Sequence, residues 1–578
     1  MHIEGALGHV GADQRRLRLY SLALANVGSW LRGVGACAAM RFAQLYRQSP
    51  ERVIIAPQDL RTTDPTEAAE IYGGYFTLAG QMVSCQGQSP FSLEPPSTAW
   101  AEELTGFGWL RHLGAADSAL AHANARALVD DFLRGGLDRR GIAARPRVIA
   151  RRLLSFLSQS PLVLDGADHA FYRVFMKALH RSTRQLERQV GLLDGESKLL
   201  VLVALTMAGL CLDKLGRVQK RSSRQLGEEL ARQILSDGGH ISRNPRVLVD
   251  MLAELLPLRQ VYAARGVTPP PQLLGAIDRM MPMLRMFRLG EGSLALFNGM
   301  GVTEPGLIAT LLAYDDTRSR AIEHARHSGY ERLESGRLVL VADVGIPPPA
   351  RYSREAHAGC LSFELSVGRS RLIVNCGSPA QGSGIPTLAA RSTAAHSTAT
   401  INDASSCIIA GSPAQDSLIR NLGVWLGMPI IGGVESVDVS RANDDEALTL
   451  GGAHDGYRSR FGVIHQRRWR LDGGREILDG EDAFIAVEDA RSGLSATLRF
   501  HLHPAVRSML TQDGYGVTLT LPEGEVWSFE VERGRLDIEE SVFFSSADGG
   551  ARRSEQIVVT VDLAEARLLR WRFLRNAA

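Results

Sequence analysis

The stretch GYERLESGRLVLVADVGIPPPA, residues 329–350, marks the point where the chain changes character. Before it, apolar residues recur every three or four positions, as amphipathic helices require. After it, short alternating or β-branched runs are separated by turn residues, which is typical of antiparallel strands. We expect a helix to pass into a strand within this stretch, and Pro347, Pro348 and Pro349 then stop regular pairing.

The change in pattern predicts two parts. Runs such as FYRVFMKALHRSTRQLERQ and ESKLLVLVALTMAGLCL predict a helical part over residues 1–335, and runs such as CLSFELSVGRSRLIVNCG and GVIHQRRWRLDGG predict an antiparallel sheet part over residues 336–578. No long flexible linker separates them. The two parts therefore pack together, and a cleft between them is the default place for a ligand.

Composition excludes several classes of protein. The 578 residues are 45% hydrophobic and carry a formal net charge of +2 that is spread along the chain, so nothing indicates a nucleic-acid partner. No run approaches twenty apolar residues, which predicts no transmembrane segment, and the N-terminus lacks the order of a signal peptide. The six cysteines form no CxxC pair and are expected to be small buried hydrophobes: Cys37, Cys85, Cys211, Cys360, Cys376 and Cys407.

Two breaks in the helical part carry polar residues that could bind a ligand. SDGGHISRNP places His240 in a glycine-bearing loop between two strong helices, and FRLGEGSLALFNGMG places Asn298 at another junction. Turn formation explains both breaks equally well, with Asp237 as a cap in the first. Both interpretations stay open at this point.

The sheet part gathers three polar groups at strand ends. Residues 360–367 and 371–376 predict a hairpin across a Gly-Arg-Ser turn. His357 precedes the first strand, Asn375 ends the second, and His396 opens a later strand. We expect these three side chains to meet at one end of a sheet.

A further polar cluster lies in AHDGYRSRFGVIHQRRWRL, which contains His454 and Tyr457. Strand alternation places His465, Arg467 and Trp469 on one face. That face could line a site, or it could be the solvated outer face of an antiparallel sheet.

These segments, together with IYGGYFTLAG and PFSLEPPSTAWAEELTGFGWLRHL near the start, resemble the heparinase II/III-like proteins, a group of polysaccharide lyases. The resemblance covers most of the chain. It implies an incomplete (α/α) toroid followed by an antiparallel β-sandwich, with a sugar-binding cleft between them. It also implies the cell envelope as the compartment, whereas the missing signal peptide favours the cytoplasm.

Lyases of this kind act by β-elimination. A base removes the proton α to a uronate carboxylate, and the glycosidic oxygen leaves from the adjacent carbon. The site must stabilise the charge that develops, and it needs an acid and a base, usually Tyr or His. No redox cofactor is required.

The family residues are only partly present. Where members show H-x-H-x-D, this chain has Glu355, His357 and Gly359. The resemblance implies a structural zinc ion on His357, Asn375 and His396, but the family has an Asp where this chain has Asn375, and a neutral amide is a weaker zinc ligand.

The expected catalytic Tyr-His pair is also changed, because Val247 and Leu248 stand in its place. The candidates for the catalytic groups are therefore His240, Tyr262, His454 and Tyr457. The candidates for substrate binding are Asn298, Arg391, His465 and Arg467.

Two functions follow. The first is a lyase that cleaves an acidic, uronate-containing glycan by β-elimination, with arginines paired to its carboxylates. The second is a noncatalytic glycan-binding or envelope-assembly protein on the same scaffold. A third and less favoured hypothesis is a glycoside hydrolase that uses Asp237 and Glu291 as its two carboxylates. The oligomeric state cannot be predicted.

Overall fold

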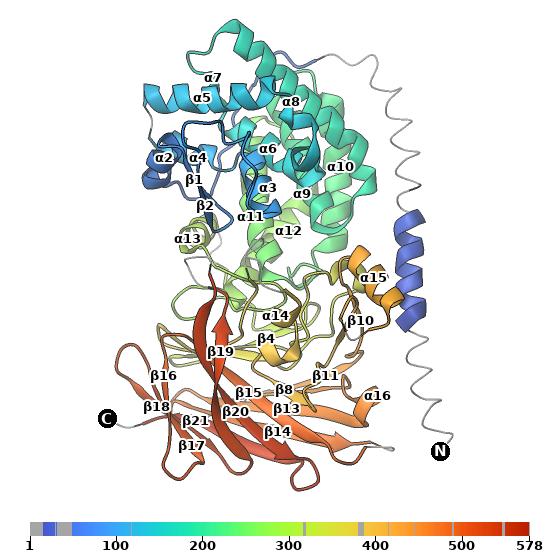
Figure 1. The fold of residues 1–578 in the computed structure, drawn as a ribbon, viewed down its shortest axis with the longest axis vertical. Helices are drawn as coiled ribbons and strands as arrows, with labels where there is room; N and C mark the ends of the chain where they lie inside the picture. The colour runs from blue at the N-terminus through green and yellow to red at the C-terminus, as the bar shows by residue number, and fades with distance from the viewer. Residues whose placement is uncertain are drawn as a thin grey trace.

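The computed structural model describes residues 15–28, 31, 49–116, 118–315, 319–379, 387–413, 415–443, 446–487, 491–545 and 550–576. A helical part, blue to green in Figure 1, stands on a layered part of antiparallel strands, yellow to red. This order confirms the predicted fold class. A separate helix at residues 15–28 runs along the outside of the strand part (Figure 1).

The helices of the first part pack in layers, with α9 in contact with α6, α8, α10 and α11. They are α2 (Pro65–Tyr72), α3 (Thr98–Gly106), α4 (Leu110–Ala115), α5 (Ala119–Arg134), α6 (Pro146–Ser158), α7 (Ser160–Leu164), α8 (His169–Gln189), α9 (Gly195–Cys211), α10 (Gly216–Gln233), α11 (Pro245–Ala264), α12 (Pro271–Met286) and α13 (Pro305–Ala313). A hairpin of β1 (Tyr75–Leu78) and β2 (Gln81–Ser84) follows α2.

Local sequence explains where these helices begin. The Asp168 side chain accepts a hydrogen bond from the backbone N–H of Phe171 and caps α8, and Asn244 caps α11 in front of Pro245 at its first position. α9 is apolar on nearly every side and is buried along most of its length, so it forms the centre of the helical core.

The strand part has two main sheets within the described residues. The eight-stranded sheet runs in the order β11 (Val437–Asn443), β12 (Leu448–His454), β13 (Val463–Asp472), β14 (Ile477–Ala486), β21 (Leu568–Arg575), β18 (Val526–Val531), β17 (Gly516–Thr520) and β16 (Arg507–Leu510). The nine-stranded sheet runs in the order β19 (Arg535–Phe543), β20 (Arg552–Asp562), β15 (Ser495–Leu502), β7 (Ser370–Val374), β6 (Phe363–Val367), β5 (Leu338–Asp343), β4 (Tyr330–Ser335) and β3 (His324–Ala325), while β8 (Ala399–Ile401) pairs with β15.

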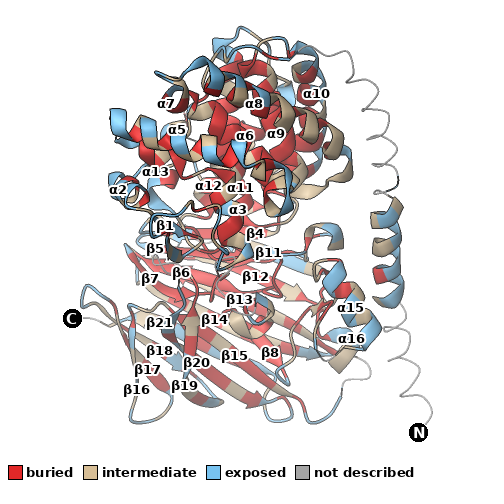
Figure 2. Ribbon diagram, turned by 45° about the horizontal axis from the view of Figure 1, so that its top comes forward, coloured by how far each residue is buried: buried red, intermediate tan, exposed pale blue. Residues whose placement is uncertain are grey.

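The two sheets enclose one aromatic core. Alternate residues of β13 and β14 are buried, as Figure 2 shows by their alternating colours. Phe363 of the nine-stranded sheet stacks on Trp571 of the eight-stranded sheet, with ring centroids 5.8 Å apart and an interplanar angle of 7°. Such contacts between inner faces are what holds a β-sandwich together.

The transition stretch differs from its prediction. Residues 330–335 form strand β4 and not the end of a helix, because they pair antiparallel with β5 and bury four of their six side chains. Gly336, at φ +59°, makes the turn between these two strands. The predicted boundary at 335/336 falls in this turn, whereas the last helix of the first part ends at Ala313.

Two smaller predictions can be compared directly. The hairpin of β6 and β7 forms as expected, but its turn is shorter because Val367 already pairs with Ser370. The cysteines Cys85, Cys211, Cys360, Cys376 and Cys407 are free and buried, while Cys37 lies outside the described residues. Among the described helices, none is both long enough and apolar enough to cross a membrane.

Arg243, in the loop between α10 and α11, joins the two parts. Its guanidinium donates to Asp343 Oδ1 at 2.6 Å and to backbone carbonyls of Ser328, Gly329, Gly345 and Ile346. Burial alone would lower the pKa of Arg243, but the neighbouring Asp343 carboxylate outweighs burial and raises it. One helical-part side chain thus fixes two turns of the nine-stranded sheet.

Candidate functional site

Four predicted residues meet at the junction of the two parts. The Asn298 side chain donates to Asp343 Oδ2 at 3.0 Å and accepts from the His357 backbone N–H at 3.1 Å. His357 Nδ1 lies 3.0 Å from His396 Nε2, and Asn375 Oδ1 accepts from the backbone N–H that follows His396. The sequence predicted that His357, Asn375 and His396 meet, and the structure places Asn298 beside them as well.

The three groups that the resemblance assigns to zinc bind one another and the backbone in this structure. His396 Nδ1 faces the Ser392 carbonyl at 2.7 Å and must donate to it, so His396 Nε2 is the acceptor of the bond from His357. That lone pair is then not free for a metal. The part of the chain that the structure describes also contains no group of three His, Cys, Asp or Glu side chains suited to a metal ion. The functions that we propose do not require zinc.

A second cluster lies inside the sandwich. His454 Nδ1 accepts from the backbone N–H of Gly456, so its Nε2 donates to His465 Nδ1 at 3.3 Å, and His465 Nε2 donates to Asp482 at 2.7 Å. Arg467 binds the same carboxylate through two nitrogens and is fully buried.

This cluster faces the core and not the solvent. Burial alone would raise the pKa of Asp482, but the Arg467 guanidinium and His465 outweigh burial and hold that pKa at about 2. The predicted alternation of His465, Arg467 and Trp469 is correct, yet these side chains point between the two sheets. The solvated outer face that we considered for them is therefore wrong.

The other candidates belong to neither hydrogen-bonded cluster, although the Tyr457 ring packs on His454 with centroids 5.5 Å apart and Arg391 binds the backbone beside His357. His240 is buried between Ser242 and Gln233, and burial lowers its pKa to about 3. The Tyr262 hydroxyl contacts Ser223, the Tyr457 hydroxyl donates to the Ala399 carbonyl, and Arg391 donates to the carbonyls of Ser353, Ala356 and Met428. Each therefore has a structural partner.

The remaining polar candidates also have partners within the protein. Asp237 accepts from the Gly239 backbone N–H of its own loop, as the turn interpretation expects, and also from the backbone N–H groups of His327 and Ser328 between β3 and β4. Glu291 contacts Ser293 and lies 3.6 Å from Arg371.

A charged cavity lies elsewhere, in the helical part. It has a volume of about 520 Å³ and is lined by α2, β1, α3, α4, α6, α11 and α13 and by the segments that precede α2 and α13. None of the eleven site residues predicted from the sequence is among its described lining residues.

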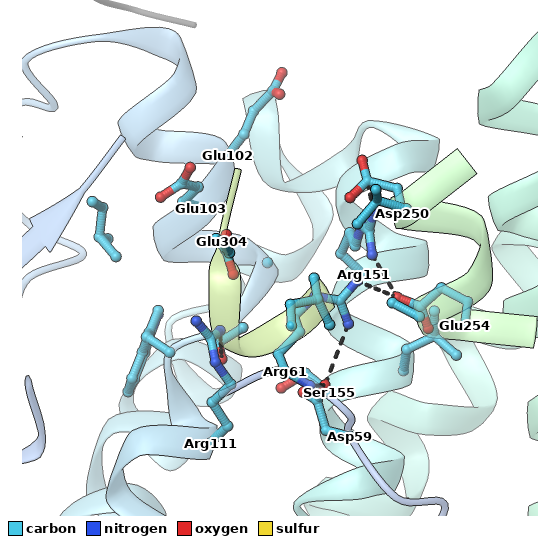
Figure 3. Close-up of a pocket in the computed structure, with 18 of the residues that line it drawn as sticks. Asp59, Arg61, Glu102, Glu103, Arg111, Arg151, Ser155, Asp250, Glu254 and Glu304 are labelled. Carbon is cyan, nitrogen blue, oxygen red and sulfur yellow. Dashed lines mark hydrogen bonds and ion pairs between the residues drawn. The ribbon is translucent and has the colours of Figure 1, made fainter. Parts of the chain in front are cut away.

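Charged side chains dominate this helical cavity. Five arginines and seven carboxylates are found among the described lining residues: Arg61, Arg111, Arg147, Arg151, Arg246, Asp59, Glu67, Glu102, Glu103, Asp250, Glu254 and Glu304. Arg61 and Arg151 both point at Glu254, at 2.7 and 2.5 Å (Figure 3). Burial, followed by the charge of Arg61, lowers the pKa of Arg151.

The opposite wall is acidic and less tightly paired. Glu103 and Glu304 lie across from Glu254 in Figure 3. Glu103 accepts from the Ala79 backbone N–H at 2.7 Å, and burial raises its pKa. Within the described residues, Glu304 makes no side-chain capping bond to α13, and the charges of Glu304 and Arg246 both act on Glu103.

Aromatic acid–base groups are scarce in the cavity. Its described lining includes no tyrosine, and its histidine is His112. His112 Nδ1 accepts from the Asp64 backbone N–H at 3.0 Å, and Nε2 lies 3.0 Å from Glu67. Burial, with the nearby Arg111, lowers the pKa of His112 to about 4. Both ring nitrogens are therefore engaged.

The sequence does contain a signal for this cavity that our prediction missed. Arg246, Asp250 and Glu254 recur every four residues in α11, and Arg147 and Arg151 do the same in α6. Side chains four apart share one face of a helix. A charged stripe on otherwise apolar helices indicates that this face lines a polar cavity.

Comparison with known proteins agrees with this architecture. Residues 317–572 match the family described as "Heparinase II/III-like, C-terminal". A protein of Caulobacter vibrioides (strain NA1000 / CB15N) named "FtsZ-localized protein C" is 32% identical over 520 residues, which cover 88% of each chain. This chain belongs to the heparinase II/III-like family.

Solved structures of the family share the fold. "Heparinase III" superposes with a TM-score of 0.69 at 12% identity, covering 96% of this chain and 91% of that one. Heparan sulfate lyase HepC from Pedobacter heparinus gives 0.57 at 14% identity, covering 94% of this chain and 88% of that one. The helical toroid and β-sandwich of this heparinase II/III-like chain are thus those of its family.

The buried histidines predict a strong dependence of stability on pH. Burial lowers the pKa of His240 to about 3 and that of His396 to about 4, whereas an unfolded histidine titrates near 6.5. As pH falls below about 6.5, the unfolded chain takes up protons that the native state does not. The free energy of unfolding should therefore fall by roughly 1.4 kcal/mol per pH unit for each such histidine.

Urea unfolding at several pH values between 7 and 5 measures this slope. His240→Asn should reduce the slope by one proton, and His169→Asn, at the exposed start of α8, should not change it. A stability that is flat over this range would contradict the assignment of neutral, buried imidazoles.

Proposed function

We propose that this protein binds a saccharide of the cell envelope in the cavity of its helical part and does not cleave it by β-elimination. The observation that carries the proposal is the composition of the cavity. Its described lining offers charged and hydroxyl groups for binding sugar hydroxyls, but no tyrosine, and a histidine whose two nitrogens are already engaged. β-Elimination needs a base placed at the α proton.

The predicted catalytic residues support the same proposal. His240, Tyr262, His454 and Tyr457 are all buried, and their polar atoms bind other protein groups. A base buried in this way cannot reach a polymer in the cavity without a rearrangement of the core. The lyase alternative therefore lacks a positioned base.

The charge of the cavity favours a saccharide of low net charge. With seven carboxylates against five arginines, a polyanion would meet an excess of negative groups. Hydroxyl and acetamido groups can instead pair with both signs of charge, and a single carboxylate can pair with Arg246. N-acetylated amino-sugar oligomers have this chemistry.

Binding and cleavage can be measured on one panel of N-acetylated amino-sugar oligomers and uronate polymers. We expect calorimetric binding of the former and no rise in ultraviolet absorbance from unsaturated uronate with the latter. Arg246→Met should weaken binding by about ten- to a hundredfold, because a hydrogen bond to a charged group contributes about 1.5–3 kcal/mol.

Arg337→Met is the matched control, because Arg337 lies in the β4–β5 turn and pairs there with Glu476 and Glu525. It should bind like the unaltered protein. An unsaturated product from any uronate polymer would refute the proposal, and so would the absence of binding across the whole panel.

We further propose that the protein takes part in envelope assembly at sites marked by FtsZ. The support is the Caulobacter vibrioides relative, whose name states that it is localised by FtsZ and whose identity spans 88% of both chains, helical and strand parts alike. A surface that such a long match preserves can include the one that FtsZ recognises.

A fluorescent fusion of the full chain, imaged together with labelled FtsZ, tests this second proposal. We expect coincident signals that disperse when FtsZ is depleted. A fusion that stays uniform at normal FtsZ levels, or that keeps its pattern after depletion, would show that FtsZ does not direct its position.

A further inference from the structure

The hairpin of β1 and β2 contributes one wall of the helical cavity and also has an exposed outer face. Thr77, Leu78 and Ala79, at its turn end, are among the residues that line the cavity. Phe76 packs beneath the hairpin on Trp109, with ring centroids 5.4 Å apart and an interplanar angle of 87°. β1 therefore directs alternate side chains into the core and away from it.

The exposed face of this hairpin carries Tyr75, Thr77, Met82 and Ser84, and we call it the hairpin face. Tyr75 pairs with Ser84 and Thr77 with Met82 across the two strands, so the four side chains lie on one side. Tyr75 and Met82 are 45% and 62% exposed. Because Thr77 belongs to the hairpin face and also lines the helical cavity, the two surfaces are continuous.

Contacts with α3 hold the hairpin in place beside the cavity. The Trp100 indole donates to the Gln81 carbonyl at 3.1 Å, and Glu103 accepts from the Ala79 backbone N–H at 2.7 Å. Tyr75 precedes Thr77 by two positions in an extended strand, which places its Cα about 7 Å further from the turn. The backbone that carries the Tyr75 ring is thus fixed just beyond the cavity lining.

The size and chemistry of the hairpin face favour a sugar chain as its occupant. A cavity of about 520 Å³ is in the range that takes one small-molecule ligand, so a longer oligomer has to continue past its rim. The C–H groups on one side of a pyranose ring form an apolar surface that packs on an aromatic ring, and the neighbouring Thr77 and Ser84 supply hydroxyls. A protein partner would need about 20–30 residues on each side, whereas the hairpin face has four.

We propose that the hairpin face is a second saccharide subsite, where the Tyr75 ring stacks on a sugar of the same chain whose end lies in the helical cavity. This inference rests on the proposed function, because it extends the same site outward. The subsite gives the protein a preference for longer oligomers over disaccharides, since only the longer ones reach Tyr75.

Calorimetry with a disaccharide and a hexasaccharide of one N-acetylated amino sugar tests the inference. We expect the unaltered protein to bind the hexasaccharide more tightly. Tyr75→Ala should weaken hexasaccharide binding by about two- to tenfold, the range for an aromatic stacking contact, and leave disaccharide binding unchanged. Tyr75→Phe keeps the ring and should bind both like the unaltered protein. Since Tyr75 is half exposed, both variants should keep the fold, which circular dichroism checks.

Tyr515→Ala is the matched control, because Tyr515 is 58% exposed in the loop between β16 and β17 of the strand part. It should bind both oligomers like the unaltered protein.

The outcomes separate this inference from the proposed function. Equal affinity of the unaltered protein for the two oligomers, or a Tyr75→Ala variant that keeps the full preference, would overturn the inference while the proposed function stands. An equal loss of both affinities in Tyr75→Ala would also overturn it, because Tyr75 would then act on the cavity itself. Absence of binding to either oligomer would overturn the proposed function as well.

Discussion

The architecture depends on one buried guanidinium at the junction of its two parts. The backbone of Arg243 adopts the left-handed region, at φ +61°. Its guanidinium donates hydrogen bonds to Asp343 and to four backbone carbonyls of the strand part. Loss of that guanidinium would leave the buried Asp343 carboxylate without its cationic partner, and breaking a buried ion pair in this way typically costs about 3–5 kcal/mol. The contact with Tyr330, whose ring centroid lies 4.7 Å from the guanidinium carbon, adds to this junction.

The junction also determines what the nearby polar residues can do. Asp343 accepts from both Arg243 and Asn298, and Asn298 in turn holds the His357 backbone in place. The two histidines of this junction, His357 and His396, therefore have structural roles. The cavity that we propose as the ligand site lies in the helical part, where α6 and α11 both contribute charged side chains to its lining. The chain keeps the fold of its family, and the polar side chains at the junction of its two parts form hydrogen bonds within the protein.

Much of the fold could be predicted from the sequence because the signals are local. In residues 360–376, two strand-like runs separated by a glycine-bearing turn predict the hairpin. In the helical part, each helix has its own three-to-four-residue apolar periodicity. The error at residues 330–335 arose because ERLES has good helix formers, and its pairing with β5 is a tertiary contact that overrides them. Alternation in β13 predicts that His465, Arg467 and Trp469 share one face of the sheet. It does not say whether that face is the buried one or the solvated one, because each sheet of a sandwich has one of each.

The candidate site was harder to predict, because it depends on tertiary packing that local sequence patterns do not show. Histidines such as His396 stand out in a sequence, whereas the helical cavity is built from residues far apart in the chain, such as Arg61 and Glu254. The four-residue spacing of charges in α11 was visible. Whether that stripe faces a cavity or a neighbouring helix depends on how the helices pack, which periodicity does not specify.

A crystal structure of the full chain with a bound N-acetylated amino-sugar oligomer tests the central claim most directly. We expect sugar rings in the helical cavity, in contact with Arg246 and with Glu103 or Glu304, and no contact with the buried histidines. Sugar density against His240, His357 or His396, or a metal ion held by them, would contradict it.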